Sequence, residues 1–155
     1  MIMKKKIFIK VSGDLIDKDT TIKLIAEKTH DAEVVVCVGG GTQINEVFQD
    51  ANISLRKHGP LGREHQSDFE KNLAAKVLNE NVTHTKSLLK KKGVFCKVIP
   101  PILDIGKVYC HVNGDQMVLA SYLGFDELYI LTTVERASKK RQEFSLYPKV
   151  LIMAI

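Results

Sequence analysis

The chain has 155 residues, a hydrophobic fraction of 45% and an aromatic fraction of 6%, which fits one soluble domain with its own core. No apolar run approaches the roughly 20 residues of a membrane span, and Lys10 interrupts the apolar start too early for a signal peptide. The net charge of +5 comes without any nucleic-acid-binding motif. We therefore expect a cytoplasmic protein with neither a membrane nor a nucleic-acid partner.

The basic residues gather at 4–6, 90–92 and 139–141. Solvated surfaces are one interpretation of these clusters, and attraction of anionic small molecules such as nucleotides is the other. The three cysteines are widely spaced and form no C-x-x-C pair. This pattern favours small buried hydrophobic residues over disulfides or metal ligands, so no metal site is expected.

In the first part of the chain, strands alternate with an amphipathic helix. The β-branched run 5–13 predicts a strand that ends at its glycine. The spacing of apolar residues over 17–31 predicts a helix capped by Asp19 or Thr20. The continuous apolar run 32–38 is typical of a strand buried on both faces.

The middle of the chain is predicted to hold three further helices separated by loops. A helix over 44–51 follows three glycines, and 57–66 is a loop because it carries two glycines and a proline. The tetrapeptide SDFE at 67–70 matches a capping box and opens the next helix. A loop over 79–85 then separates that helix from a short one over 86–92.

The last third contains three strand-like runs, over 94–99, 127–133 and 150–155. The turn-rich segment 100–107 connects to 108–123, which is predicted to run from an extended segment into a helix. Residues 134–149 are polar and are expected to be irregular. The alternation of strands and helices predicts a single α/β domain over 1–155, a three-layer α/β/α sandwich with a mainly parallel sheet.

Glycines stand where two of the predicted strands end: Gly13 after the first, and Gly39–Gly41 after the second. Ligands of open parallel sheets bind at the carboxyl ends of strands. Glycine lets backbone N–H groups approach an anion, and a following helix N-terminus adds positive charge. A phosphate or carboxylate cradle and a tightly packed turn are equally open interpretations. The absence of G-K-[ST] and of G-x-G-x-x-G disfavours a Walker loop and a dinucleotide fingerprint.

Five polar residues near these strand ends are candidates for a site. Lys10 either neutralises a phosphoryl group at the end of its strand or reaches solvent from an edge strand. Asp115 either caps a helix or orients a lysine. His111 and Asn113 alternate in an extended segment and can face one side. Arg63 either holds a carboxylate or lies on the surface.

Four segments together resemble the amino acid kinase family, which includes acetylglutamate, aspartate, carbamate and uridylate kinases. The segments are KVSG at 10–13, VGGGTQINE at 38–46, GPLGRE at 59–64 and HVNGDQMVLASYLGFDELYILTTV at 111–134. Their order and spacing agree over nearly the whole chain, and the last is most similar to acetylglutamate kinases. The resemblance implies an α/β sandwich on which ATP with Mg²⁺ and a small carboxylate or phosphate acceptor meet in line for phosphoryl transfer.

The resemblance also implies roles for individual residues. Lys10 would stabilise the transferring phosphoryl group, and Asp115 would orient catalytic lysines. The acceptor side would be formed by Gly39, Gly40, Gly41, Arg63, His111 and Asn113. The nucleotide side would be formed by Ser12, Gly13, Thr132 and Thr133.

The chain departs from the family pattern in its C-terminal part. Family members are usually longer, and their C-terminal half carries the adenine pocket and a second catalytic lysine. Here Thr133 and Arg136 replace an aspartate and a glycine, and His111 replaces an asparagine. One hypothesis is a phosphotransferase whose ATP is held by another chain or by the basic segment 139–141. The other is a non-catalytic anion-binding or regulatory module. The resemblance also predicts a homodimer or another homo-oligomer.

Overall fold

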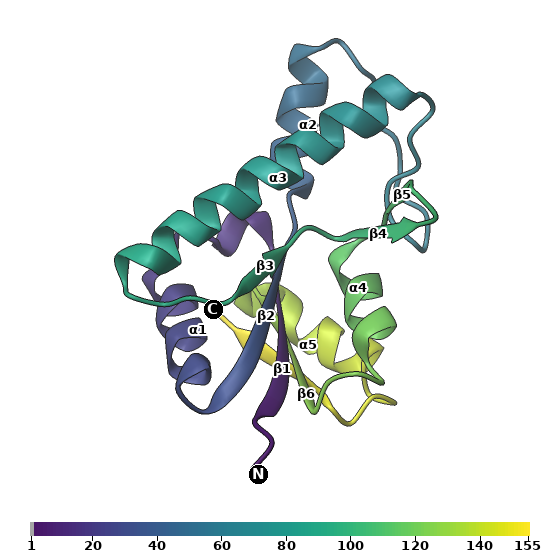
Figure 1. Ribbon diagram of the computed structural model, residues 1–155. Helices are drawn as coiled ribbons and strands as arrows, with labels where there is room; N and C mark the ends of the chain where they lie inside the picture. The colour runs from purple at the N-terminus through teal and green to yellow at the C-terminus, as the bar shows by residue number, and fades with distance from the viewer. Residues whose placement is uncertain (1) are drawn as a thin grey trace.

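The computed structural model describes residues 2–155, and its centre is a five-stranded sheet in the order β3-β2-β1-β6-β7 (Figure 1). The strands are β1 (Lys5–Val11), β2 (Ala32–Val38), β3 (Lys97–Ile99), β6 (Glu127–Thr132) and β7 (Val150–Ala154). Every neighbouring pair in this sheet is parallel. The predicted α/β class with a mainly parallel sheet is therefore confirmed.

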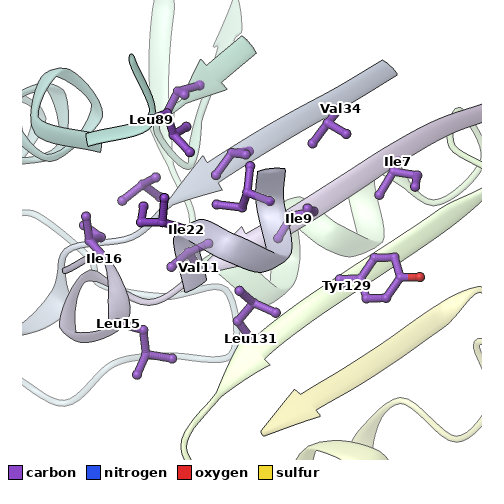
Figure 2. Packing of buried hydrophobic residues seen from close by; sticks show 14 of the residues in the cluster. Ile7, Ile9, Val11, Leu15, Ile16, Ile22, Val34, Leu89, Tyr129 and Leu131 are labelled. Atoms are coloured by element: carbon purple, nitrogen blue, oxygen red, sulfur yellow. The ribbon is translucent and has the colours of Figure 1, made fainter. Parts of the chain in front are cut away.

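Helices cover both faces of the sheet and complete a three-layer sandwich. One face carries α1 (Asp19–Asp31) and α3 (Asp68–Lys91), and the other carries α4 (Gly114–Ser121) and α5 (Val134–Glu143). Side chains of a strand point alternately to its two faces. In β1, Ile7 and Ile9 therefore pack on the α1 side (Figure 2), whereas Phe8 packs with Met117 of α4. The sheet thus has a core on each side.

Helix α3 is one continuous helix of 24 residues, so the predicted loop over 79–85 is wrong. Asparagine and threonine have low helix propensity, which is why this stretch looked like a break. However, Leu78 and Val82 continue the buried face of the helix. The Thr85 hydroxyl also donates a hydrogen bond of 2.8 Å to the Asn81 carbonyl within the helix. Packing on the sheet therefore outweighs the local preference.

The segment 100–107, predicted as a turn-rich connection, contains a strand instead. Strand β4 (Ile102–Ile105) pairs antiparallel with β5 (Val108–His111) in a separate hairpin. The turn residues Gly106 and Lys107 have φ values of 60° and 69°. Positive φ at both central positions gives a turn whose twist suits two antiparallel strands.

The polar segment 134–149 is not irregular throughout, because it begins with helix α5. Ala137 is the one buried residue within this helix, so its sequence carries almost no apolar periodicity. The predicted caps of α1 were also wrong: Lys18 is the N-cap residue, and its side chain makes no capping hydrogen bond. Ser67 caps α3 as predicted, since its hydroxyl accepts a hydrogen bond from the Glu70 amide.

The carboxyl ends of β1, β2 and β6 lie at one edge of the sheet. The short 3₁₀ helix η1 (Gly13–Leu15) follows β1, and α2 (Gly41–Asp50) follows β2. The strand order reverses between β1 and β6, so the loops after these strands run in opposite directions and leave a crevice. Helix α2 and the β4–β5 hairpin lie beyond this edge (Figure 1).

Two further observations concern composition. The three cysteines are free; Cys37 is buried as predicted, whereas Cys96 and Cys110 are only half-buried. Among the helices of residues 2–155, none combines the length and the apolar character needed to cross a membrane.

Candidate functional site

Lys10 lies in the central strand of the sheet, so the interpretation that it reaches solvent from an edge strand is wrong. Its backbone pairs with Cys37 of β2 on one side and Ile130 of β6 on the other. Its side chain is only 15% exposed and points to the face covered by α4 and α5. A buried ammonium group needs a polar partner, and here the partner is a carboxylate.

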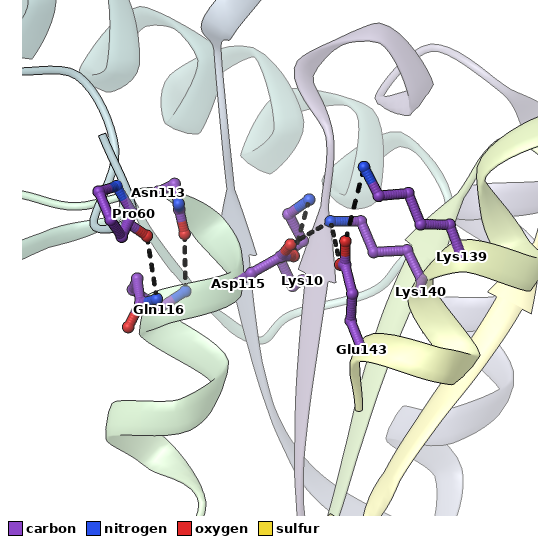
Figure 3. Close-up of polar contacts among 8 residues, drawn as sticks. All are labelled: Lys10, Pro60, Asn113, Asp115, Gln116, Lys139, Lys140 and Glu143. Atoms are coloured by element: carbon purple, nitrogen blue, oxygen red, sulfur yellow. Dashed lines mark hydrogen bonds and ion pairs between the residues drawn. The ribbon is translucent and has the colours of Figure 1, made fainter. Parts of the chain in front are cut away.

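That carboxylate belongs to Asp115, in the first turn of α4, and it lies between two lysines (Figure 3). Lys10 Nζ is 3.7 Å from Asp115 Oδ1. Lys140 of α5 contacts Asp115 Oδ2 and lies 3.4 Å from Glu143 Oε2. Three elements distant in sequence therefore hold two cations around one carboxylate. The Asp115 carboxylate thus contacts both lysines, and Asn113 rather than Asp115 is the N-cap residue of α4.

The two lysines respond differently to this environment. Burial lowers the pKa of Lys10 below its ordinary value, although the charge of Asp115 opposes the shift. Burial alone would also lower the pKa of Lys140, but the hydrogen bond and charge of Asp115 raise it, with help from Glu143. Burial thus disfavours the charge on Lys10 more than Asp115 favours it, and a further anion next to the ammonium would favour that charge.

The glycine loop, Gly39–Gly41, follows β2 and offers two free backbone amides. The Gly39 amide donates to the Val11 carbonyl at 2.9 Å, so this glycine does not act as an anion donor, contrary to our expectation. Within residues 2–155, the amides of Gly40 and Gly41 have no hydrogen-bond acceptor. They stand at the start of α2, where the helix dipole favours an anion.

Close packing against α3 explains why position 40 is a glycine, but it does not explain the glycine at position 41. A Cβ at Gly40 would lie 2.7 Å from Asn81 Nδ2 and 3.1 Å from Leu78 Cδ2, whereas one at Gly41 would meet nothing within 4 Å. The Asn81 amide also donates to the Gly39 carbonyl at 3.0 Å. The middle of α3 therefore fixes the position of the glycine loop.

Arg63 is buried, although an arginine in a loop is usually exposed; it is 8% exposed. Its Nη2 donates to Asn45 Oδ1 at 2.6 Å and to the Gly41 carbonyl at 3.4 Å. Its guanidinium carbon lies 5.3 Å from the centre of the Phe48 ring. No carboxylate of residues 2–155 forms an ion pair with it, and its Nε has no acceptor there. Arg63 is thus a buried cation that lacks a counter-ion.

Histidines surround this arginine, and sequence reasoning singled out only one of them. His111 Nδ1 lies 2.9 Å from His65 Nε2, and His65 Nδ1 is buried without a partner. Burial, and then the nearby His65 and Arg63, lower the pKa of His111 to about 4. Burial, with Arg63, also lowers the pKa of His58. These imidazoles are therefore neutral around neutral pH.

Asn113 and Gly114 shape the start of α4. Asn113 is the N-cap residue, since its side-chain oxygen accepts a hydrogen bond of 2.8 Å from the Gln116 amide. A Cβ at Gly114 would lie 2.3 Å from Lys10 Cε. The stem of Lys10 therefore passes directly against the backbone of α4, and a larger residue at Gly114 would displace it.

Two cavities meet at Lys10 and Ser12, which line both. The first has a volume of about 190 Å³ and lies between the glycine loop, Arg63 and the start of α4. Of the predicted site residues, it is lined by Lys10, Ser12, Gly13, Gly39, Gly40, Gly41, Arg63, His111 and Asn113. A larger space of about 640 Å³ under the β4–β5 hairpin adjoins it through Arg63 and His111.

The second cavity occupies the crevice between the ends of β1 and β6 and has a volume of about 320 Å³. Thr132 and Thr133 line it, as do the cations Arg136 and Lys140 and the carboxylates Asp14 and Glu135. No group of three or more His, Cys, Asp or Glu side chains in the described chain is arranged to hold a metal ion. The structure thus brings the predicted residues together in two adjoining spaces, except for Asp115, which lines neither. Gly13, predicted on the nucleotide side, lines only the first cavity.

No protein-family model matches the chain, and no curated protein does. Among solved structures, it is similar to the crystal structure of smu.665 from Streptococcus mutans UA159. The two share 15% sequence identity, with a TM-score of 0.73 over 97% of this chain and 95% of that chain. A likeness at this identity shows the fold alone.

Proposed function

We propose that this protein is an amino acid kinase-like phosphotransferase, which moves a phosphoryl group from ATP to a small carboxylate or phosphate acceptor. The observation that carries the proposal is the position of Lys10. It lines the wall shared by two cavities, each with its own cations, so groups bound in the two would face each other across its ammonium. Phosphoryl transfer needs this arrangement, because positioning and charge neutralisation supply most of its catalysis.

The acceptor would bind in the cavity beside the glycine loop. Arg63 supplies a buried positive charge without a counter-ion, and the amides of Gly40 and Gly41 supply two further donors. An acceptor oxygen held by these groups would point towards Lys10. A carboxylate or phosphate is already deprotonated at neutral pH, so this transfer needs no general base.

The donor phosphates would bind in the crevice between β1 and β6. Lys140 and Arg136 are its cations, and the hydroxyls of Ser12, Thr132 and Thr133 are within its lining. Mg²⁺ is usually held by one or two carboxylates together with phosphate oxygens, and Asp14 and Glu135 fit that requirement. When bound, Mg²⁺ would neutralise charge on the phosphates.

Asp115 would act as a positioning residue. Its carboxylate holds Lys10 and Lys140 on the two sides of the proposed transfer path. Both cations would thus be fixed before the substrates bind, which stabilises a transition state without reorganisation. We place this activity in the cytoplasm and expect self-association, and a second chain would contribute to ATP binding if the crevice alone is insufficient.

The test is a turnover assay with Mg-ATP and a panel of small carboxylates and phosphomonoesters, followed by ³¹P NMR. We expect ADP and a new acyl-phosphate or phosphoanhydride signal with at least one acceptor. The Arg63→Gln variant should lose this product, whereas Arg141→Gln, outside both cavities, should keep it. Binding of acceptors without ADP formation from any of them would refute the proposal.

The second candidate is a non-catalytic module that binds small anions. It is favoured by one observation, the composition of the crevice, where Leu15 is the one apolar side chain in the lining. Such a wall suits phosphates better than an adenine ring, since nucleoside pockets are mainly apolar. Calorimetry that detects small carboxylates but not Mg-ATP would support this candidate.

A further inference from the structure

The starting point is the uncompensated charge of Arg63. Its neighbours are the amide oxygen of Asn45, the Gly41 carbonyl and the face of Phe48, all of them neutral. A buried guanidinium is normally paired with a carboxylate or phosphate, because desolvation of an unpaired charge is costly. Arg63 lines both the cavity beside the glycine loop and the larger space under the hairpin. An anion at the junction of these spaces would supply the missing partner.

Two imidazoles share this junction with Arg63. His111 lines both spaces, and His65 lines the larger one. Their mutual hydrogen bond uses His111 Nδ1 and His65 Nε2, which leaves His65 Nδ1 buried and unpartnered. Phe48 packs against His65 at 5.9 Å between ring centres and against Arg63, so the three groups form one cluster. A neutral imidazole offers one donor, and a protonated one offers two.

Burial and the charges around the pair explain its state without a ligand. Burial is the main cause that disfavours protonation of His65; Arg63, Lys71 and His58 add to it, and Glu70 opposes it. Burial likewise disfavours protonation of His111, and His65, Arg63 and His58 add to it.

A bound monoanion would cancel the charge of Arg63 and leave little reason for proton uptake. Of the two spaces, Lys10 lines only the smaller, and it is already paired with Asp115. The larger space is lined by Asp68, Lys71 and Lys107. A dianion beside Arg63 would therefore leave one negative charge uncancelled next to the imidazoles, and that charge favours an imidazolium.

We propose that the acceptor carries a dianionic phosphomonoester or phosphonate rather than a carboxylate, and that the His65–His111 pair takes up a proton when this group binds beside Arg63. The inference rests on the proposed function, because it names the acceptor class for the same site. The pair thereby discriminates between acceptors by charge. A tetrahedral dianion gains a second cationic partner, whereas a planar monoanion does not.

Isothermal titration calorimetry with sulfate and acetate tests this at constant ionic strength. Sulfate remains a dianion throughout, so any proton uptake comes from the protein. We expect uptake of about one proton per sulfate, and affinity that rises by up to about tenfold for each pH unit as the pH falls from about 8 to about 6. Acetate should bind more weakly, with less than about a twofold change over that range.

Variants assign the proton to the pair. His111→Asn and His65→Asn should each remove the pH dependence of sulfate binding, and the exposed control His30→Asn should retain it. Arg63→Gln should lose sulfate binding altogether. Circular dichroism checks that each variant is folded. Titration of the wild-type protein with sulfate in two buffers of different ionisation enthalpy measures the number of protons taken up, from the difference between the two binding enthalpies. This measurement does not depend on any variant.

Several results would overturn the inference. Sulfate binding without proton uptake, or an acetate affinity with the same pH dependence, would remove the charge discrimination. Turnover with carboxylates but with no phosphomonoester would overturn it while leaving the proposed phosphotransfer intact. Proton-coupled sulfate binding without turnover of any acceptor would instead refute the proposed function and leave an anion-binding site.

Discussion

The two cavities that meet at Lys10 differ in how the protein neutralises their positive charges. In the cavity beside the glycine loop, the proposed acceptor side, Arg63 contacts only neutral groups. In the crevice, the proposed donor side, Lys140 is paired with both Asp115 and Glu143. The first cavity thus offers a cation without a counter-ion, whereas phosphates in the second would compete with the protein's own carboxylates. We therefore expect small anions to bind tightly in the absence of ATP, and ATP to bind weakly in the absence of an acceptor.

The largest effect is expected for Lys10→Met, because Lys10 lines both cavities. We expect turnover to fall by about 10²–10³-fold, as for the loss of one preorganised donor. Stability should not fall. Because burial lowers the pKa of Lys10, the folded chain gains stability as pH rises from that lowered pKa towards 10.5, and below it the charge is unfavourable. Urea unfolding at neutral pH should give an equal or higher midpoint; a lower midpoint would show that Lys10 is needed for the fold.

Lys140→Met and Lys139→Met are a matched pair on the donor side. Lys140 has a raised pKa, so its ion pair stabilises the fold at neutral pH, and this contribution is lost only as pH rises above 10.5. We expect Lys140→Met to reduce stability by about 1–2 kcal/mol and turnover by at least about tenfold. Lys139 is 80% exposed, and its replacement should change stability by less than about 0.5 kcal/mol. If the two variants lose stability and turnover to the same extent, the ion pairs of Lys140 with Asp115 and Glu143 have no special role.

On the acceptor side, His111→Asn should change how stability depends on pH. Burial and neighbouring positive groups lower the pKa of His111 to about 4 from an ordinary 6.5. The unfolded chain therefore binds the proton first, and the folded chain loses stability as pH falls from 6.5 towards 4. The variant should lack this loss, which amounts to roughly 3 kcal/mol at pH 4. Thermal unfolding at several pH values measures it, and parallel profiles for the two proteins would contradict the assignment.

The smallest effect is expected at the glycine loop. Gly40→Ala should reduce stability by about 1–2 kcal/mol, because its Cβ would press on Asn81 and Leu78. Gly41→Ala meets open space and should change stability by less than about 0.5 kcal/mol. Chemical denaturation compares the two. If Gly41→Ala proves the more destabilising, the loop is not fixed by α3 as described.

The sequence predicted the parts of the fold that have strong local patterns. The runs around Val36 and Ile130 are apolar throughout, and both are buried central strands. A break was expected in α3 because Asn81 and Thr85 have low helix propensity. The prediction was wrong because packing against the sheet overrides this preference, and that packing is visible only in three dimensions. Helix α5 was missed because its one buried residue, Ala137, leaves no periodic signal.

The same reasoning applies to the candidate site. Lys10, Arg63 and Asp115 stood out because each is a polar residue in an unusual context, and the fold brings them to one edge of the sheet. His65 carried no such signal, since its partner His111 is 46 residues away and meets it only when the hairpin is in place. Lys140 could not be distinguished from Lys139 until the helix set which of them faces Asp115.

The central position of β1 has a consequence for the order of folding. Its first neighbour, β2, is close in sequence, but its second, β6, pairs Ile7 with Glu127 near the other end of the chain. Pairing between such distant segments is slow, because a long loop must close first. During synthesis, β1 therefore lacks its β6 neighbour until the later part of the chain is made, and the Lys10 ammonium lacks its Asp115 partner. We expect docking of β6 to limit the rate of refolding, and the waiting intermediate to be the species most prone to aggregation.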